Sequence, residues 1–479
     1  MNRTKLFRLL EHIGIEEKVV KVMRKLYEGN KVNFNLGESQ SGWMNNNVGV
    51  RQGCVLSPTL FNIYIEELLQ RIRRSEKGVK IGENNLGGLA YADDIVLIAD
   101  KRDDMEELLR IAETYGREWD IRFNGVKCKV MEYNSTGNSQ WVLGNAILEV
   151  VEKYSYLGIE VNKEGIGGEK QRKINEGKAR RMTGMIINGG KRSINKFELG
   201  RSLWKGMAVP YYLYGSEITY YREGDISKLE KAQSIIGRWS LGVPKSTAIE
   251  AIRGDMGWST FRERIVKGKL RLSKRIEGLS GDRWVKRILN NWGDNSSWKK
   301  ELERWKRRED LDNDWPRLSS NKVRQRIEEN GKTRWQLGME RKSTLKWYRK
   351  REKPEAIKWH MGDQGSKLLA KARSGTMEVK SRNRNEEDQN CSICRDERET
   401  IEHFIVECPG YREQRGRLVE SIKGILGLTE WQKRLEEEDG GILTVLGLYE
   451  SGEKSERIVR ETKKFLAMAW EIRTRTTRR

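Results

Sequence analysis

The sequence has 479 residues, with 93 Lys and Arg against 70 Asp and Glu, so its formal net charge is +23. Its 36% hydrophobic and 34% charged residues leave enough apolar side chains for several small cores, which argues against a disordered chain. No window approaches the ~20 apolar residues of a membrane-spanning helix, and the residues after Met1 do not form a secretory signal.

The charge is unevenly distributed along the chain. Residues 1–150 contain 21 basic and 21 acidic side chains, so the whole excess lies in residues 151–479, which contain 72 basic and 49 acidic ones. An excess of this size favours a polyanionic partner such as nucleic acid, bound by the rear of the chain. The alternative is that these Lys and Arg side chains are solvated on ordinary helices.

The first 165 residues alternate between helical and strand-like patterns. We expect an α+β fold built on an antiparallel sheet, with two helices over 4–27 separated near Gly14, a strand at 32–36, a helix over 60–74 and a helix over 102–119. Residues 89–91 and 95–99 predict a hairpin with Asp93 and Asp94 at its tip. Further strands are predicted at 121–123 and 126–133, and a second hairpin is predicted from 147–151 and 156–161.

Beyond Gly165 the pattern becomes helical and basic. Helices are predicted at 168–188, 195–215, 225–240 and 260–277, which would form a helical bundle. Eight tryptophans then alternate with Lys and Arg: Trp284, Trp292, Trp298, Trp305, Trp315, Trp335, Trp347 and Trp359. They could stack on bases of single-stranded nucleic acid, or they could anchor small helical cores, and the pattern leaves both interpretations open.

Two adjacent carboxylates at a hairpin tip repel each other unless a cation neutralises them. Asp93 and Asp94 therefore form a candidate Mg²⁺ site, and a pair of such ions can assist an in-line phosphoryl displacement. The alternative is a solvated turn, because turns favour aspartate in general.

Four ordered motifs resemble the reverse transcriptases of non-LTR (LINE-type) retrotransposons. They are Arg51-Gln52-Gly53-Cys54-Val55-Leu56-Ser57-Pro58 opening a helix, Tyr91-Ala92-Asp93-Asp94, Gly125-Val126-Lys127-Cys128-Lys129, and Tyr154-Ser155-Tyr156-Leu157-Gly158. The resemblance implies a partial right-hand polymerase palm in which Asp93 and Asp94 bind catalytic Mg²⁺. It further implies that Gln52, Gly53, Tyr91 and Lys127 contact substrate and that Leu157 and Gly158 form the primer grip.

One element of that family is missing. Its palm begins with a strand bearing another aspartate, and residues 1–92 contain none. We expect that aspartate and the fingers to precede Met1, so that the chain corresponds to the rear half of a longer polyprotein and lacks activity alone.

A second chemical pattern is Cys391-x2-Cys394-x8-His403-x4-Cys408, which supplies three thiolates and one imidazole. Four protein ligands complete the tetrahedral shell of a structural Zn²⁺ and leave no open position for water. Incidental thiols are the alternative. The pattern also resembles the CCHC knuckle of the same family, and basic residues that could grip RNA or target DNA flank it: Lys380, Arg382, Arg384, Arg412 and Arg415.

The predicted domains are a partial palm (1–166), a helical thumb (167–280), a basic Trp-rich helical linker (281–380), a zinc knuckle (381–425) and a C-terminal helical tail (426–479). In the tail, Phe465, Leu466, Met468 and Trp470 are expected to pack in a last helix before basic residues 473–479. His12 and His360 are expected to be non-catalytic.

The resemblance implies an RNA-directed DNA polymerase that uses an RNA template, a DNA primer or target and dNTPs, in the nucleus. A non-catalytic nucleic-acid-binding remnant is the alternative.

Overall fold

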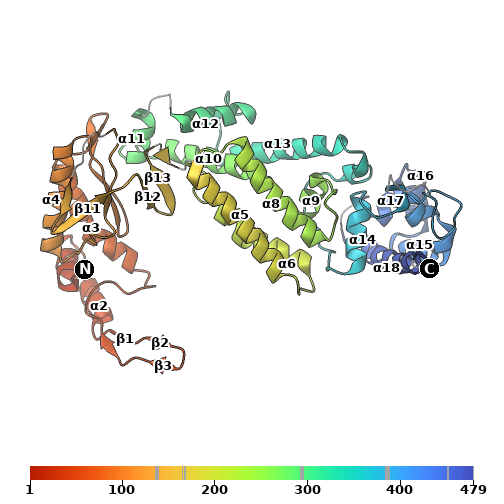
Figure 1. The fold of residues 1–479 in the computed structure, drawn as a ribbon, viewed down its shortest axis with the longest axis horizontal. Coiled ribbons are helices and arrows are strands. Elements are labelled where there is room, and N and C mark those ends of the chain that lie inside the picture. Colours follow the sequence, from red (N-terminus) through yellow and green to blue (C-terminus); the bar gives the residue numbers. More distant parts are fainter. Residues whose placement is uncertain are drawn as a thin grey trace. The chain divides into compact units, whose positions relative to one another are not determined.

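The computed structural model describes residues 1–134, 140–163, 165–166, 169–291, 296–382, 389–449 and 452–477, without the side chains of 169–176. The chain divides into two compact units, the first made of Met1–Gly168 and Leu279–Gly293 and the second of Glu169–Gly278 and Asp294–Arg479. Both are described separately below. The fold is mixed α+β, mostly helical with small sheets (Figure 1). Among the described helices, none combines the length and apolarity needed to cross a membrane.

The helices of the first unit confirm the predictions from periodicity. The predicted helices are α1 (Arg3–His12), α2 (Glu17–Tyr27), α3 (Ser57–Arg74) and α4 (Arg102–Trp119), and α11 (Trp284–Asn291), from later in the chain, was not predicted. The Asn2 side chain caps α1 by accepting from the amides of Thr4 and Lys5. One apolar cluster joins α1, α2 and α3 around Leu6 and Tyr64, and another joins α3 and α4 around Leu68 and Tyr115.

The strands that the structure describes in the first unit form six separate small sheets instead of one, and most pairs are antiparallel. They are β1 (Lys31–Val32), β2 (Asn35–Leu36), β3 (Ser39–Gln40), β4 (Met44–Asn45), β5 (Val79–Ile81), β6 (Asn84–Leu86), β7 (Gly88–Tyr91), β8 (Asp94–Leu97), β9 (Lys129–Val130), β10 (Trp141–Leu143), β11 (Ala146–Val150), β12 (Lys153–Tyr156), β13 (Ile159–Asn162) and β14 (Gly165–Ile166). The hairpin predicted around Asp93 and Asp94 is confirmed as β7–β8.

Three strand predictions were wrong, each for a local reason. Residues 121–123 form no strand because Ile121 donates its amide to Gly116 and so closes the end of α4. Of the strand predicted at 126–133, only β9 is formed. The Asn124 side chain accepts hydrogen bonds from the amides of Val126 and Lys127, which makes a turn at the start of this segment. The segment predicted as one strand at 32–36 is divided between β1 and β2, which pair with β4 and β3.

The second predicted hairpin paired the wrong segments. β11 pairs with β10 and, in parallel, with β9, whereas β12 pairs with β13. Leu157 and Gly158 both have positive φ, at 49° and 74°, and form a two-residue turn that sets this register.

The helices predicted in 168–277 are confirmed in the second unit, and one helix was missed. They are α5 (Glu169–Gly189), α6 (Lys196–Leu203), a π-helical turn (Trp204–Ala208), α7 (Val209–Leu213), α8 (Glu223–Leu241), the missed α9 (Ile249–Met256) and α10 (Phe261–Glu277). α5 and α6 pack along α8 (Figure 1), around a core that includes Trp204 and Ile236. His360 also lies in this region, where burial lowers its pKa to about 4 and its Nε2 lies 3.1 Å from the Leu241 carbonyl oxygen.

Most of the described tryptophans of 284–359 pack in or against apolar cores. Trp305, Trp315, Trp335 and Trp347 are at most 6% exposed, so the base-stacking interpretation was wrong for these four. The partly buried ones are Trp284, Trp298 and Trp359, and Trp292 lies outside the described residues. Trp298 and Trp305 lie in α12 (Ser297–Arg308), and Trp335 lies in α13 (Ser320–Glu340).

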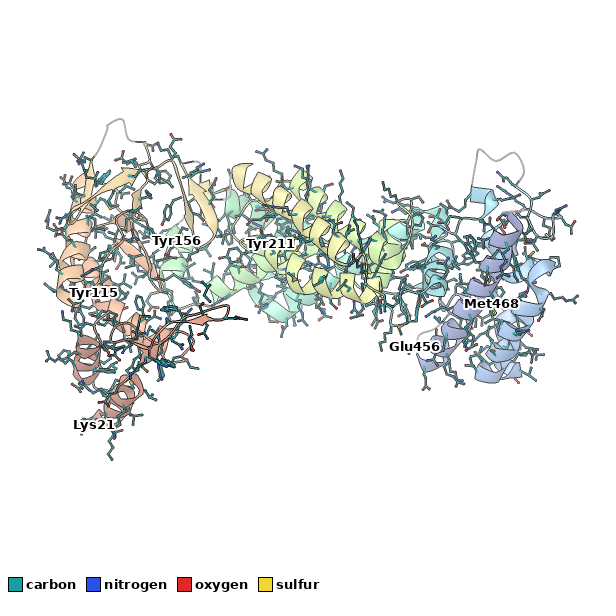
Figure 2. The ribbon with its side chains drawn as sticks, turned by 60° about the horizontal axis from the view of Figure 1, so that its bottom comes forward. Lys21, Tyr115, Tyr156, Tyr211, Glu456 and Met468 are labelled. Carbon is teal, nitrogen blue, oxygen red and sulfur yellow. The ribbon has the colours of Figure 1, made fainter. Side chains whose placement is uncertain are left out.

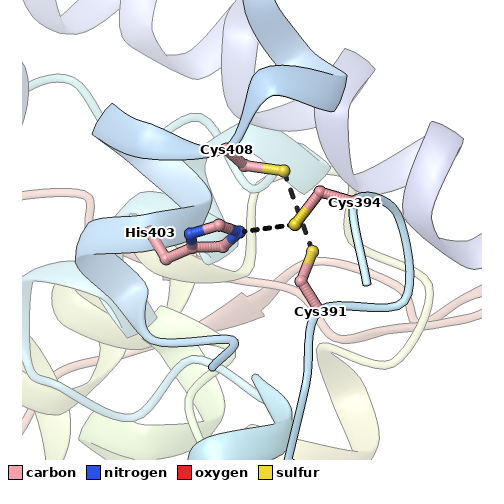
Figure 3. A group of neighbouring side chains, drawn as sticks. All are labelled: Cys391, Cys394, His403 and Cys408. Carbon is pink, nitrogen blue, oxygen red and sulfur yellow. Dashed lines mark hydrogen bonds between the residues drawn. The ribbon is translucent and has the colours of Figure 1, made fainter. Parts of the chain in front are cut away.

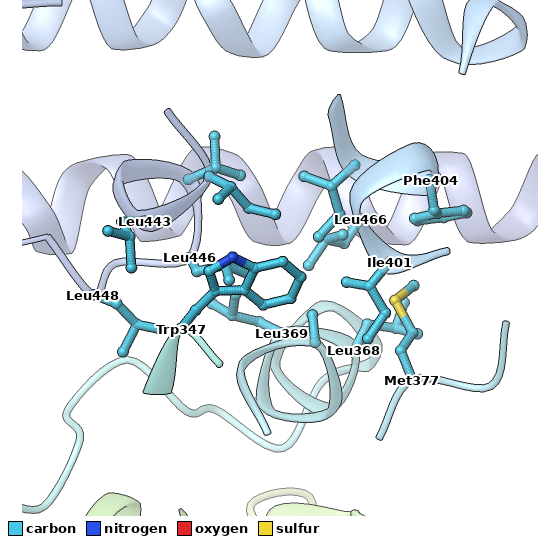
Figure 4. Close-up of a cluster of buried hydrophobic side chains, with 14 of the residues drawn as sticks. Trp347, Leu368, Leu369, Met377, Ile401, Phe404, Leu443, Leu446, Leu448 and Leu466 are labelled. Atoms are coloured by element: carbon cyan, nitrogen blue, oxygen red, sulfur yellow. The ribbon is translucent and has the colours of Figure 1, made fainter. Parts of the chain in front are cut away.

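The C-terminal part of the second unit contains α14 (Gln364–Arg373), α15 (Arg412–Leu426), α16 (Leu428–Glu436), α17 (Gly440–Val445) and α18 (Glu453–Thr477). Figure 4 shows its core, in which Trp347 lies among leucines that include Leu446 and Leu448. Phe465 and Leu466 of α18 are buried as predicted, but Met468 is 38% exposed and the prediction for it was wrong. Short single turns complete the unit at Trp315–Arg317, Ser343–Leu345, Tyr348–Lys350, Lys380–Arg382, His403–Glu407 and Pro409–Tyr411.

Arg473 does not begin a free basic tail. It is buried in α18 and donates from Nε and an Nη to the two carboxylate oxygens of Glu399, at 2.6 and 2.7 Å. Glu399 is fully buried and also accepts from the Lys380 amide at 2.8 Å. This bidentate pair fastens α18 to the loop that carries the predicted zinc ligands.

Replacing Arg473 by alanine is therefore expected to destabilise the C-terminal part by about 3–5 kcal/mol, because Glu399 keeps a buried charge without its cation. Urea unfolding followed by amide exchange in α18 measures this loss. Arg475→Ala is the control, since Arg475 is 77% exposed and its one ion-pair partner among the described residues is Glu471 on the same helix. Equal stability of the two variants would contradict the expectation.

Candidate active site and metal centre

The β7–β8 hairpin places two carboxylates at the surface of the first unit. Tyr91 pairs with Asp94, so that Ala92 and Asp93 form the turn between the strands. Ala90, Ile95 and Leu97 pack against the core of α3 and α4, whereas Asp93 and Asp94 are exposed. The apolar side of the hairpin is thus fixed by two helices, and its tip presents the acids to solvent.

The turn that carries Asp93 is strained. Ala92 has φ +53°, in the left-handed region that costs an L-residue about 1–2 kcal/mol. Backbone strain of this kind collects at functional sites when the surrounding structure holds it in place.

Ala92→Gly is expected to stabilise the first unit by about 0.5–1 kcal/mol, because glycine adopts this conformation without a Cβ penalty. The midpoint of urea unfolding measures the change. Ala90→Gly is the matched control, since Ala90 lies within β7 and loses a partly buried methyl group, which should destabilise the unit. A loss of stability in both variants would show that the turn is unstrained.

Asp93 and Asp94 are available to a cation. In the part of the chain that the structure describes, neither carboxylate has an arginine or lysine partner. No third His, Cys, Asp or Glu among the described residues completes a metal-binding group with them. The site therefore offers two ligating residues of the hard oxygen type that Mg²⁺ prefers.

The β12–β13 hairpin lies beside this site. Burial raises the pKa of Tyr156, labelled in Figure 2, and the negative charge of Asp94 raises it further. Tyr154 donates its hydroxyl to the Lys127 carbonyl oxygen at 3.5 Å, which brings the turn of Lys127 to the same hairpin. Leu157 is half-buried and Gly158 is exposed at the end of the hairpin. Tyr156 was not among the predicted site residues, although its place in the Tyr-x-Tyr-Leu-Gly motif could have indicated it.

Gln52 and Gly53 are exposed in the turn before α3. Gly53 has φ +79°, and the Ser57 hydroxyl donates to the Arg51 carbonyl oxygen at 2.6 Å, which closes this turn. Within the described residues, no hydrogen bond or ion pair joins Gln52 or Lys127 to either aspartate. Tyr156 thus lies within electrostatic reach of Asp94. Among the described residues, no hydrogen bond or ion pair connects Asp93 or Asp94 to Gln52 or Gly53.

The second cluster brings all four predicted ligands together. The Sγ atoms of Cys391 and Cys408 are 3.7 Å apart, and the Cys394 Sγ is 3.4 Å from His403 Nε2 (Figure 3). All four ligand atoms lie within 4.8 Å of one another. With Zn–S of about 2.3 Å and Zn–N of about 2.0–2.1 Å, a tetrahedral shell requires edges of about 3.8 Å for S–S and about 3.6 Å for S–N. The cluster therefore fits a tetrahedral zinc ion.

Local backbone structure sets this geometry. Cys408 donates its amide to the His403 carbonyl oxygen at 2.8 Å, so one π-turn brings both side chains to the same side. The Ile393 amide lies 3.5 Å from the Cys391 Sγ. A Cβ at Gly410 would lie 2.1 Å from the Ile393 side chain, which explains the glycine after Pro409.

A carboxylate orients the histidine. His403 Nδ1 lies 2.8 Å from a Glu397 carboxylate oxygen, which leaves Nε2 free to ligate a metal. The ligand spacing gave no signal for Glu397, because the pattern leaves the eight residues between Cys394 and His403 unspecified. Burial raises the pKa of the Cys408 thiol to about 12. At Cys394, burial acts in the same direction, but hydrogen bonds that include those from the Glu397 and Asp396 backbone outweigh it and lower the pKa of that thiol to about 7.

The basic residues around this cluster differ in their surroundings. Arg415 donates to the Cys408 carbonyl oxygen at 2.5 Å and so stabilises the backbone beside that ligand. Burial lowers the pKa of Arg382. Arg412 is exposed, Lys380 is half-buried and Arg384 lies outside the described residues.

The sequence is similar to one family of known proteins. The family model described as reverse transcriptase (RNA-dependent DNA polymerase) matches residues 1–161. The Pol polyprotein of the type-1 retrotransposable element R2 from Nasonia vitripennis is 26% identical over 272 residues, which cover 53% of this chain and 25% of that protein. The RNA-directed DNA polymerase from mobile element jockey of Drosophila melanogaster is 25% identical over 183 residues, or 36% of this chain and 19% of that protein. The matches thus span a quarter or less of these relatives.

Proposed function

Because residues 1–161 belong to the reverse transcriptase family of non-LTR retrotransposons, we propose that this chain acts in RNA-directed DNA polymerisation. The observation that supports the proposal is the pair Asp93 and Asp94, exposed at a strained hairpin tip beside Tyr156. The substrates would be an RNA template, a DNA primer or target and dNTPs.

The proposed roles follow the motifs. Asp93 and Asp94 would hold Mg²⁺, which when bound makes the primer hydroxyl more acidic and stabilises charge on the phosphates. Gln52, Gly53, Tyr91 and Lys127 would contact the nucleotide or template. Leu157 and Gly158 would support the primer end.

The larger organisation is proposed on the same basis. Residues 1–166 would be a partial polymerase palm, 167–280 the thumb, and 381–425 a zinc knuckle that grips RNA or target DNA. Zinc would be structural there, since four protein ligands leave no open position. A nuclear site of action follows from priming on chromosomal DNA.

A second candidate function is favoured by the ligand set. The two aspartates have no third metal ligand among the described residues, and residues 1–92 contain no aspartate. The candidate is nucleic-acid binding without catalysis, through the basic rear of the chain. We expect the activity of this chain alone to be weak, because the metals supply most of the acceleration in this mechanism.

The two candidate functions predict different results when the dependence of dNTP incorporation on an RNA template is measured. Labelled dNTP incorporation is measured with a primer on an RNA template, with Mg²⁺, and compared with reactions that lack the template. Template-dependent product supports the polymerase. Tight primer–template binding without product would instead favour the second candidate.

A further inference from the structure

Three arginines gather around one buried tryptophan in the second unit. Trp305 of α12 is fully buried in an apolar core with Leu302 and Val266. The guanidinium carbons of Arg262, Arg304 and Arg308 lie 6.0, 5.2 and 5.5 Å from the centre of its ring. Each distance is within the range of a cation–π contact. Trp305 therefore does not stack on bases but fixes the positions of three cations.

The carboxylates around these arginines do not balance their charge. Glu223 pairs with both Arg262 and Arg308, and its distance to Arg308 is 3.3 Å. The carboxylate nearest to Arg304 is that of Glu301, at 3.9 Å. That carboxylate already pairs at 2.8 Å with Lys269, and both partners are 1% exposed. Among the described residues, the three arginines thus have one accessible carboxylate partner, Glu223, which pairs with two of them.

The exposed side of α12 extends this positive surface. Lys300, Arg304 and Arg307 follow one another at helical spacing, and Arg304 and Arg308 are four residues apart. Neither Lys300 nor Arg307 has an ion-pair partner in the described ranges. Like charges four residues apart cost a helix about 0.2–0.5 kcal/mol. The repulsion between these cations therefore destabilises α12 in the free protein, and a bound anion would remove that repulsion.

The chemistry of the surface identifies the anion. Guanidinium groups donate two parallel hydrogen bonds to phosphate oxygens, and several of them in a row match a repeating phosphate backbone. Tyr220 is 37% exposed and its ring centre lies 6.0 Å from the Arg304 guanidinium carbon, so an aromatic surface adjoins the cations. Aromatic side chains beside a basic groove are typical of proteins that bind single strands.

We propose that Arg262, Arg304 and Arg308, with Lys300, Arg307 and Tyr220, form a binding surface for the phosphate backbone of single-stranded nucleic acid. Trp305 is the positioning residue that holds the arginines in place. The proposal rests on the nucleic-acid-binding part of the proposed function and is independent of the polymerase chemistry.

The test compares two double variants of the full chain that lose the same charge. Arg304→Gln with Arg308→Gln removes two cations of the surface, and Arg460→Gln with Arg475→Gln removes two that are exposed on α18, outside both this surface and the proposed knuckle. Binding of a labelled single-stranded RNA or DNA oligonucleotide is followed by fluorescence anisotropy over a range of salt concentrations. Each phosphate contact changes the slope of log K against log salt by about 0.7 for a single strand.

The surface variant should therefore bind about tenfold more weakly at physiological salt. Its plot of log K against log salt should be less steep by about 1.4, while the control changes little. Equal losses in the two variants, or no loss in the first, would overturn the proposal. Weakening that appears only with a duplex probe would overturn the assignment to single strands.

A conservative variant separates binding from folding. Arg304→Lys with Arg308→Lys keeps both charges, so it should restore the salt slope even though lysine lacks the forked geometry. If the lysine variant binds as weakly as the glutamine variant, the arginines act through the fold and the surface is not a phosphate site. Binding is measured without Mg²⁺ and dNTPs, so that no polymerisation can occur and failure of the polymerase proposal and failure of this one are distinguishable.

Discussion

Asparagine in place of Asp93 is expected to lower RNA-templated nucleotide incorporation by about a thousandfold or more. The substitution removes one of two metal-ligating carboxylates at the tip of β7–β8 and leaves the side chain volume unchanged. A thousandfold loss corresponds to about 4 kcal/mol in the activation barrier, which is a reasonable share of what metal ions supply to phosphoryl transfer. Asparagine suits a turn as well as aspartate does, so the hairpin should keep its fold.

Asp100→Asn is the matched control for this experiment. Asp100 is exposed, lies in the same unit and loses the same charge when replaced. Its incorporation should stay within a factor of about two, since surface substitutions change little else. Binding of the primer–template should be the same in both variants. Equal incorporation by the two variants would contradict the role of Asp93.

Removal of zinc is expected to unfold the C-terminal part of the second unit. The four ligands lie close enough for a tetrahedral ion. The core around Phe404 and Leu466 is continuous with the segment that carries them. Zinc binding contributes about 10–16 kcal/mol in small zinc-binding peptides, more than the stability of most domains. Chelation, or Cys408→Ser, should therefore expose the amides of α15 and α18 to rapid hydrogen exchange.

Cys128→Ser provides the control, because that thiol lies in the first unit outside the cluster. It should keep about one zinc per chain and the protection of α15 and α18. Slow exchange after complete removal of zinc would show that the apolar core holds this part without metal. A zinc content that Cys408→Ser leaves unchanged would contradict the assigned ligands.

Prediction from the sequence succeeded where one local signal determined the structure. The periodicity of 102–119 is that of α4, and the two strand-like runs at 89–91 and 95–99, on each side of Asp93 and Asp94, gave the β7–β8 hairpin. The ligand spacing gave all four members of the cysteine–histidine cluster, because a π-turn and a tight loop are encoded within a few residues.

Apart from the strands lost to local turns, the failures concern interactions between distant residues. The strand at 147–151 was assigned to the wrong partner, because its pairing with β9 and β10 depends on the turn at Asn124 and on a strained turn at Leu157. Arg473 looked like part of a solvated tail, yet Glu399, 74 residues earlier, draws it into the core. The basic residues around Trp305 suggested base stacking, and only the packing of α10 against α12 shows that the ring is covered.

The most direct test of the central claim is where a divalent ion binds in the first unit. Fe²⁺ replaces Mg²⁺ at many oxygen-ligated sites and, with ascorbate and peroxide, cleaves the backbone next to its ligands, so the fragments identify the site. Cleavage within 88–97 that is lost in Asp93→Asn and retained in Asp100→Asn is the predicted result. Cleavage that the Asp93 substitution leaves intact, or none near the β7–β8 turn, would contradict a metal site at these two aspartates.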